Sequence, residues 1–258
     1  RSGALLINYT GHGNQKTLAH EAVVTLSQIN SWKNMDNLPV FVTATCEFSR
    51  FDDYEFTSAG EQILLNSEGG GIALFTTTRI VYSGANFDLN KEFYRHVFER
   101  DDDDGKFLKL GEIIRKTKNG IGSDSNKRNF SLLGDPALTI AIPEYIVKRD
   151  TINGESINIY QDTVGAASEI VVEGHIEDRN GNIMNDFNGV IYPEVFDKVM
   201  DYTTLSNDAN RAITFKEQKN ILYSGKASVE NGYFKFKFMI PVDIGYYADY
   251  GKISYYAK

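Results

Sequence analysis

Three short, continuous apolar runs constrain the fold of the first half of this chain more than any other feature. Each run lies between Gly, Pro or polar turn residues, and a strand with this pattern is buried on both faces, as in a parallel sheet covered by helices. Three further segments space their apolar residues at helical intervals. The sequence therefore predicts an α/β fold, a mainly parallel sheet with flanking helices, from buried strands at 4–9, 39–44 and 71–76 and helices at 58–65, 86–98 and 108–117.

The pattern changes after Pro143, where apolar and polar residues begin to alternate. Alternation is clear in the runs 169–176, 189–195 and 233–238, and Asn-Gly turn signals separate such runs. A period of two indicates strands with one buried face, and no helical pattern interrupts them. The second half is therefore expected to be an all-β, immunoglobulin-like sandwich of about 110 residues. We divide the chain into a domain of residues 1–145 and a domain of residues 146–258.

Composition excludes several classes of function. A formal net charge of −8, without a cluster of Lys and Arg among aromatic residues, argues against nucleic acid as a partner. A single cysteine excludes an internal disulfide and a zinc site with several thiolates. The acidic run 101–104 lacks the spaced ligands of a calcium loop and is expected to be an exposed turn. We expect neither a metal nor a cofactor.

Two residues with catalytic potential follow the first two predicted strands. His12 lies between two glycines just after the first strand, and Cys46 comes just after the second. Neighbouring parallel strands end about 5–10 Å apart, so the two side chains can meet. An imidazole can take the proton of a thiol, and the N–H groups of Gly13 and Cys46 can stabilise an oxyanion. The alternative is a turn histidine and a cysteine that only fills the core.

Residues beside this pair are candidates for substrate binding. Glu47 follows the cysteine directly, and Thr78 and Arg79 follow the third predicted strand on the same edge of the sheet. Loops at strand ends commonly carry binding functions, although a charged surface loop is an equally good interpretation. His20 and Glu21 are expected to lie in a solvated loop outside the catalytic pair.

The same segments resemble the catalytic-domain motifs of gingipain-type cysteine peptidases, whose domain has a caspase-like fold. The resemblance covers roughly residues 1–143 and is carried by three ordered motifs, at 8–13, 41–48 and 132–138. Three further segments are more similar to the sortase-like members of the type IX secretion system in Bacteroidetes than to secreted digestive members. These segments are 29–34, 49–53 and 75–79.

The resemblance implies an enzyme of the cell surface, on the extracellular side of the outer membrane. Such an enzyme removes the C-terminal secretion domain of cargo proteins through a thioester on Cys46. Water or an amine of lipopolysaccharide then attacks the thioester, which leaves hydrolysis and transfer as alternative outcomes. Its expected partners are these protein substrates, lipopolysaccharide and other secretion-system proteins. The family's acidic residue that orients the histidine lies upstream of the Gly-His-Gly motif, so the first domain is expected to be the C-terminal part of a peptidase domain, inactive by itself. The alternative is a catalytically silent surface scaffold in a secretion complex.

Overall fold

A computed structural model describes residues 3–123, 125–160, 163–207, 211–244 and 247–258. The chain divides into two compact units, residues 1–142 and 143–258. Each unit has its own buried core. No helix in the described ranges is long and apolar enough to cross a membrane.

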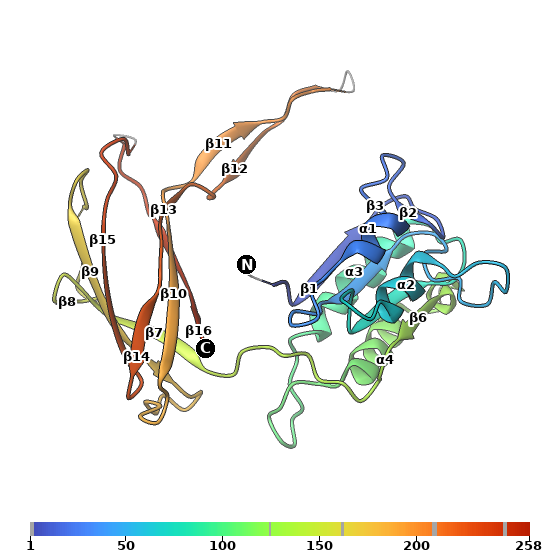
Figure 1. The fold of residues 1–258 in the computed structure, drawn as a ribbon, viewed down its shortest axis with the longest axis horizontal. Helices are drawn as coiled ribbons and strands as arrows, with labels where there is room; N and C mark the ends of the chain where they lie inside the picture. Colours follow the sequence, from blue (N-terminus) through green and yellow to red (C-terminus); the bar gives the residue numbers. More distant parts are fainter. Residues whose placement is uncertain (1–2, 124, 161–162, 208–210, 245–246) are drawn as a thin grey trace. The chain divides into compact units, whose positions relative to one another are not determined.

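A four-stranded sheet forms the centre of the first unit (Figure 1). Its order is β1-β4-β5-β6, in which β1 and β5 run parallel to β4 and β6 runs antiparallel to β5. The expected α/β fold with a mainly parallel sheet is therefore confirmed. The strands are β1 (Leu6–Thr10), β4 (Val40–Ala44), β5 (Ala73–Thr77) and β6 (Phe130–Leu133).

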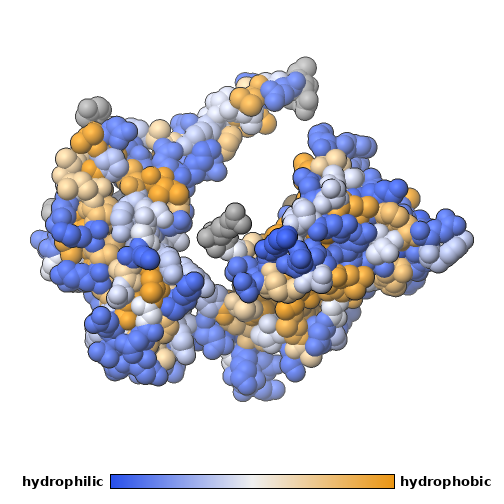
Figure 2. All heavy atoms as spheres, viewed as in Figure 1, coloured by the Kyte–Doolittle hydropathy of each residue, from blue (hydrophilic) through white to orange (hydrophobic). Residues whose placement is uncertain are grey.

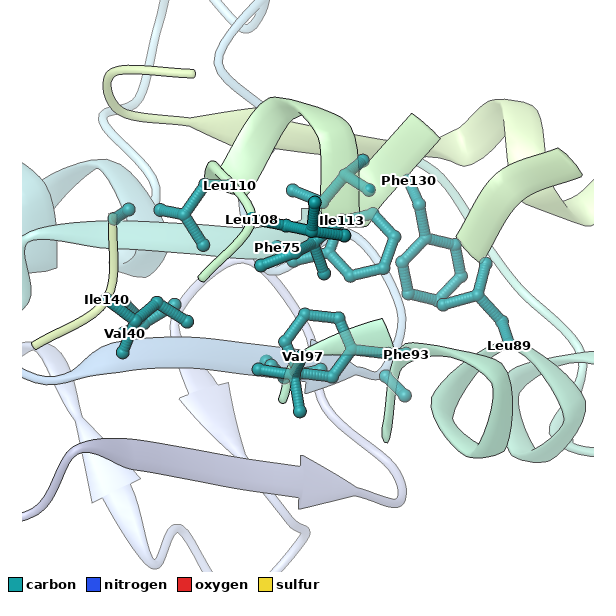
Figure 3. Close-up of a cluster of buried hydrophobic side chains, with 14 of the residues drawn as sticks. Val40, Phe75, Leu89, Phe93, Val97, Leu108, Leu110, Ile113, Phe130 and Ile140 are labelled. Carbon is teal, nitrogen blue, oxygen red and sulfur yellow. The ribbon is translucent and has the colours of Figure 1, made fainter. Parts of the chain in front are cut away.

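Side chains of β4 and β5 alternate between two cores, one on each face of the sheet. Phe41 and Leu74 pack on one face against α1 and α2, where Trp32 stacks on Phe41 with ring centroids 5.9 Å apart. Val42 and Phe75 pack on the other face against α3 and α4. Figure 3 shows Phe75 together with Phe93 of α3 and Ile113 of α4. Both central strands are buried along their whole length, as continuous apolar runs predict. The helices are α1 (Leu26–Ser31), α2 (Ala59–Leu65), α3 (Ser83–His96) and α4 (Leu110–Gly120).

Strand β1 differs from the expectation of a buried strand. Its five residues are intermediate or exposed, and Ile7 is 37% exposed. The physical reason is its position, because β1 is the edge strand of the sheet and, among the described strands, pairs only with β4. Three small elements complete the unit: β2 (Thr17–Leu18), β3 (Val24–Thr25) and the 3₁₀ helix η1 (Ser125–Asn129).

The second unit is an antiparallel β structure in which no helix is described. Its main sheet has the order β13-β10-β14-β15-β9-β7-β8, and β16 adds to β10. The expected all-β class is confirmed, but one curled sheet takes the place of two separate ones, because β10 pairs with β16 on one edge and with both β13 and β14 on the other. The strands are β7 (Ile146–Ile152), β8 (Glu155–Ser156), β9 (Glu169–Glu177), β10 (Gly189–Phe196), β13 (Ile221–Ser224), β14 (Ala227–Glu230), β15 (Tyr233–Met239) and β16 (Lys252–Ala257).

Alternation of buried and exposed residues builds the core of this unit. On β15, Phe234, Phe236 and Phe238 are buried while the residues between them face solvent. A separate hairpin of β11 (Met200–Thr203) and β12 (Thr214–Glu217) projects from the sheet (Figure 1). Apolar and hydrophilic side chains mix along this hairpin (Figure 2), and Leu205 is 85% exposed.

Candidate active site

The ends of β1 and β4 place the two proposed catalytic residues on neighbouring strands. Thr10 pairs with Ala44 at the last position of the parallel ladder, and the Gly11 N–H donates to the Ala44 carbonyl at 3.4 Å. His12 and Cys46 each come two residues after this final pair. The backbone therefore brings His12 and Cys46 to the ends of neighbouring parallel strands, as the sequence predicts.

A close backbone approach joins the histidine loop to the cysteine segment. A Cβ atom added to Gly13 would lie 2.5 Å from Thr45 Oγ1 and 3.0 Å from the Thr17 carbonyl oxygen, so only glycine fits without displacing a neighbour. Thr45 precedes Cys46 and is fully buried, and its hydroxyl has no hydrogen-bond partner among the described residues. The Gly13 backbone thus packs directly against the residue next to the thiol.

Hydrogen bonds hold the carbonyl of His12 and leave its ring in solvent. The His12 carbonyl accepts from the Tyr9 hydroxyl at 2.6 Å and from the Ala19 N–H at 2.8 Å. Burial raises the pKa of the Tyr9 phenol, and the charge of Glu21 adds to this rise. The His12 ring is exposed and lies 5.5 Å from the His20 ring, measured between centroids, and both line a cavity of about 170 Å³. His20 is exposed, as expected of a solvated loop, but it lies beside the proposed base.

The thiol of Cys46 is half-buried and has a backbone partner. Its Sγ donates to the Val81 carbonyl at 3.6 Å, and it packs against the core shared with α3 and α4. Within the described part of the chain, no hydrogen bond joins Cys46 to His12. The structure therefore places the two residues at adjacent strand ends without forming a hydrogen-bonded dyad.

Two buried amides connect the end of β4 to the loop that holds the Val81 carbonyl. Asn86 Nδ2 donates to the Ala44 carbonyl at 3.3 Å, and its Oδ1 accepts from Asn126 Nδ2 at 3.0 Å. Asn126 Oδ1 in turn accepts from the Tyr82 N–H at 2.9 Å. Both amides are only 4% exposed. We call this pair of linked amides, Asn86 and Asn126, the relay. Local sequence pattern does not predict it, although one signal exists, because Asn86 is a polar residue on the apolar stripe of α3.

Each of the three predicted substrate-binding residues has a partner within the chain. Glu47 has a left-handed backbone with φ of 52°, its N–H donates to the Arg79 carbonyl at 3.2 Å, and its carboxylate pairs with Arg50 at 3.3 Å. Thr78 donates from both its N–H and its hydroxyl to the Asn129 carbonyl. These bonds fix the backbone of the loop around the thiol.

The Arg79 guanidinium forms an exposed, bidentate ion pair with the Asp52 carboxylate. Its hydrogen bonds and charge hold the pKa of the Asp52 carboxyl below its ordinary value, and Asp52 raises the pKa of Arg79 in return. Because both side chains are about half-exposed, at 47% and 46%, this pair contributes little to stability. It does orient Arg79 at the rim of the site.

Two backbone N–H groups in the segments that follow β1 and β4 are not used by the fold. Among the described residues, neither the Gly13 N–H nor the Cys46 N–H donates a hydrogen bond. Unused N–H donors beside a nucleophile are the components of an oxyanion hole. In the same described ranges, no three His, Cys, Asp or Glu side chains gather in a group that could hold a metal.

Comparison with known proteins identifies the family. The family model described as "Peptidase family C25" matches residues 1–141. Among solved structures, dimeric latent PorU from Porphyromonas gingivalis is similar, with 28% identity over 74% of this chain and a TM-score of 0.43. The complex of the pro- and mature domains of RgpB from Porphyromonas gingivalis shows 15% identity over 94% of this chain and a TM-score of 0.48.

This chain covers 18% of the PorU chain and 48% of the RgpB chain. A search of curated proteins gave no match. The family match spans more than half of the chain and contains both strand ends with His12 and Cys46. This chain therefore belongs to peptidase family C25, a family of cysteine peptidases.

Proposed function

We propose that Cys46 is the nucleophile and His12 the general base of a cysteine peptidase. The observation that carries this proposal is the contact of the Gly13 backbone with Thr45, because it holds the histidine loop against the residue that precedes the thiol. The unused N–H groups of Gly13 and Cys46 support an oxyanion site beside the thiol. Residues 1–145 are proposed to be the C-terminal part of the peptidase domain and residues 146–258 an immunoglobulin-like domain.

The proposed reaction has two steps. First, His12 takes the thiol proton, Cys46 Sγ bonds to the scissile carbonyl carbon, and the protonated His12 gives that proton to the leaving amine as the C–N bond breaks. The product is a thioester on Cys46. Water or a primary amine then attacks the thioester, loses a proton to His12 and releases the thiol. Water gives hydrolysis, whereas an amine gives transfer to a new amide.

The substrate and location follow from the resemblance of segments around the site to sortase-like members of the family. We propose that the substrates are cargo proteins with a C-terminal secretion domain, that the accepting amine belongs to lipopolysaccharide, and that the enzyme works on the extracellular side of the outer membrane with other secretion-system proteins. Glu47, Thr78 and Arg79 line the proposed substrate path, and the hydrogen bonds of their loops support a fixed backbone there.

A second candidate function is a catalytically silent surface scaffold. One observation favours it: the Cys46 thiol donates to the Val81 carbonyl and is not hydrogen-bonded to His12 in the described part of the chain. The fold therefore already holds this thiol by a backbone carbonyl and not by the proposed base. An active enzyme has to break this bond when substrate binds, whereas a scaffold keeps it.

Thiol alkylation in the intact protein separates the two functions. Cys46 is the only cysteine of this chain, so iodoacetamide incorporation here reports on this site alone. For a peptidase we expect fast labelling at pH 6.5, where an ordinary thiol is only about 1% thiolate. We also expect His12→Ala to slow labelling by about tenfold or more.

The matched control is His20→Ala, because His20 lies in the same cavity and is also exposed. It should leave the labelling rate within about twofold of the parent. Labelling only after denaturation, or equal rates for the His12 and His20 variants, would exclude the proposed pair and favour the scaffold. In the active enzyme, trapping by hydroxylamine would reveal the thioester that both reactions share. Mass spectrometry of the product formed in the presence of a primary amine would then distinguish transfer, which gives a new amide, from hydrolysis, which gives a free carboxylate.

A further inference from the structure

A cavity of about 450 Å³ lies between β7 and β16 in the second unit. Its walls include residues Val147 to Arg149 of β7, and Lys252, Ile253 and Tyr255 of β16. This volume is in the range of sites that bind small molecules or short peptide segments. The cavity is independent of Cys46 and His12, which belong to the first unit.

Two strand edges border the cavity. Among the described strands, β16 pairs only with β10, and β7 pairs with β9 along its length but with β8 only at Thr151 and Ile152. Cα atoms of β7 and β16 come within 8 Å of each other at only a few positions, and the two strands are not paired, so they are further apart over the rest of their length. Their facing edges therefore present backbone N–H and C=O groups that no described strand uses. Such an edge is a template for an added strand.

Two buried polar atoms beside the cavity have no well-aligned hydrogen-bond partner. Arg149 Nε and Tyr255 Oη are both buried, and neither makes a hydrogen bond of good geometry to a described residue, although the two side chains lie close enough to interact with each other. Burial raises the pKa of the Tyr255 phenol, and the nearby Arg149 guanidinium opposes this rise. Leaving a buried donor unpaired is costly, so both groups favour a ligand that accepts hydrogen bonds.

The charges around the cavity have one sign. Lys148, Arg149 and Lys252 line it, and none of the described acidic side chains does, although the whole chain has a net charge of −8. Lys148 is paired with Glu177 at 3.3 Å, and Lys252 lies over the Phe196 ring at 4.3 Å. Arg149 thus supplies the least compensated charge, and its planar guanidinium suits a carboxylate.

We propose that an extended, acidic polypeptide segment of a partner protein docks in this cavity by adding a strand to the free edge of β16. Its backbone pairs with β16, one carboxylate binds the Arg149 guanidinium, and the Tyr255 hydroxyl donates to the same group. The ligand is expected to be a polypeptide because the unpaired strand edge offers backbone hydrogen-bonding groups. It is expected to be acidic because three cationic side chains line the cavity. This site would bind a partner protein, and the proposal does not depend on the proposed peptidase activity.

The test uses the full chain and a fluorescein-labelled hexapeptide in which Glu and Val alternate. Binding is measured by fluorescence anisotropy at about 50 mM salt, where charge attraction is weakly screened. We expect saturable binding of this peptide and none of a matched peptide in which Lys replaces Glu. Methylation of alternate backbone nitrogens in the Glu peptide should abolish binding, because it removes the donors of the added strand.

Two variants and a control locate the site. Arg149→Met keeps the apolar stem and should weaken binding about tenfold or more, since it removes a charge-assisted hydrogen bond. Tyr255→Phe removes only one hydroxyl, so it keeps the test valid if the first variant unfolds, and it should weaken binding about threefold or more. Lys237→Met is the matched control, because Lys237 is an exposed cation of the same unit that pairs with Glu169 at 3.1 Å.

Three results would overturn the proposal. One is equal binding of the Glu and Lys peptides, and another is equal affinity of the Arg149, Tyr255 and Lys237 variants. The third is tighter binding of an oligothymidylate of the same net charge, which would show that the cations select phosphate rather than an acidic peptide.

Discussion

Gly13→Ala tests whether the histidine loop rests on the segment of the nucleophile. The new Cβ would lie 2.5 Å from Thr45 Oγ1 and 3.0 Å from the Thr17 carbonyl oxygen, and real Cβ atoms essentially never come within 3.0 Å of another heavy atom. Thr45 cannot move freely because it is fully buried and its own carbonyl accepts from the Thr77 hydroxyl. Overpacking of this kind costs about 1–3 kcal/mol, and we expect that loss in the free energy of unfolding.

The assay is chemical denaturation followed by tryptophan fluorescence. Trp32 is the only tryptophan and is stacked on Phe41, so its signal reports on the first unit. A second substitution, Thr45→Ala, removes the crowded atoms, and the double-mutant cycle should give a coupling energy of about 1–2 kcal/mol. The control is Gly84→Ala in α3, where a Cβ meets no atom within 4 Å and should be neutral or stabilising by up to about 1 kcal/mol.

A coupling energy within about 0.5 kcal/mol of zero would refute the reasoning. It would mean that Gly13 and Thr45 are not in contact in solution, and the main support for the proposed active site would be lost. Loss of iodoacetamide labelling in Gly13→Ala with recovery in the double variant would link the same contact to thiol reactivity.

Two further predictions concern the relay and the rim of the site. Asn86→Leu should lower the free energy of unfolding by about 1–3 kcal/mol for each hydrogen-bond partner left unpaired. The control Lys91→Ala, on the exposed face of the same helix, should change the free energy of unfolding by less than about 0.5 kcal/mol. If Asn86→Leu changes it as little as the control does, the relay is not formed. The Asp52 carboxyl should titrate below its ordinary pKa of 3.8 in a carbon-detected NMR titration, because Arg79 stabilises its ionised form. The ion pair is thus present above about pH 4 and is lost as the pH falls through the lowered pKa. Arg79→Met should raise the midpoint toward the ordinary value of 3.8, and an unchanged midpoint would contradict the ion pair.

Much of the fold could be predicted from local pattern. The runs at 39–44 and 71–76 are buried strands β4 and β5, because continuous apolar sequence has to be covered on both faces. The helix expected at 86–98 is α3 at Ser83–His96, and the alternating run at 233–238 is β15 at Tyr233–Met239. The change of pattern after Pro143 lies at the division between the two units.

The two strand-end motifs could also be recognised in the sequence. A histidine between glycines and a cysteine after the next strand lie at the same edge of a parallel sheet whenever the two strands are neighbours, and β1 and β4 are neighbours. The order of the strands in the sheet and the burial of its edge strand could not be predicted from the sequence in this way. The exposure of β1 depends on which strands flank it, and a run of apolar letters does not carry that information.

Sequence alone thus determined which segments are strands or helices, where His12 and Cys46 lie along the chain, and which family the chain resembles, because these depend on local spacing and motif. Only the tertiary structure decided that the thiol faces the Val81 carbonyl, that Gly13 rests on Thr45, and that Asn86 bridges β4 to the loop of Val81. It also decided that the second unit is one curled sheet whose strand β16 has an edge that no described strand covers. The physical reason is the same in each case: these partners are distant in sequence, and packing in three dimensions selects them.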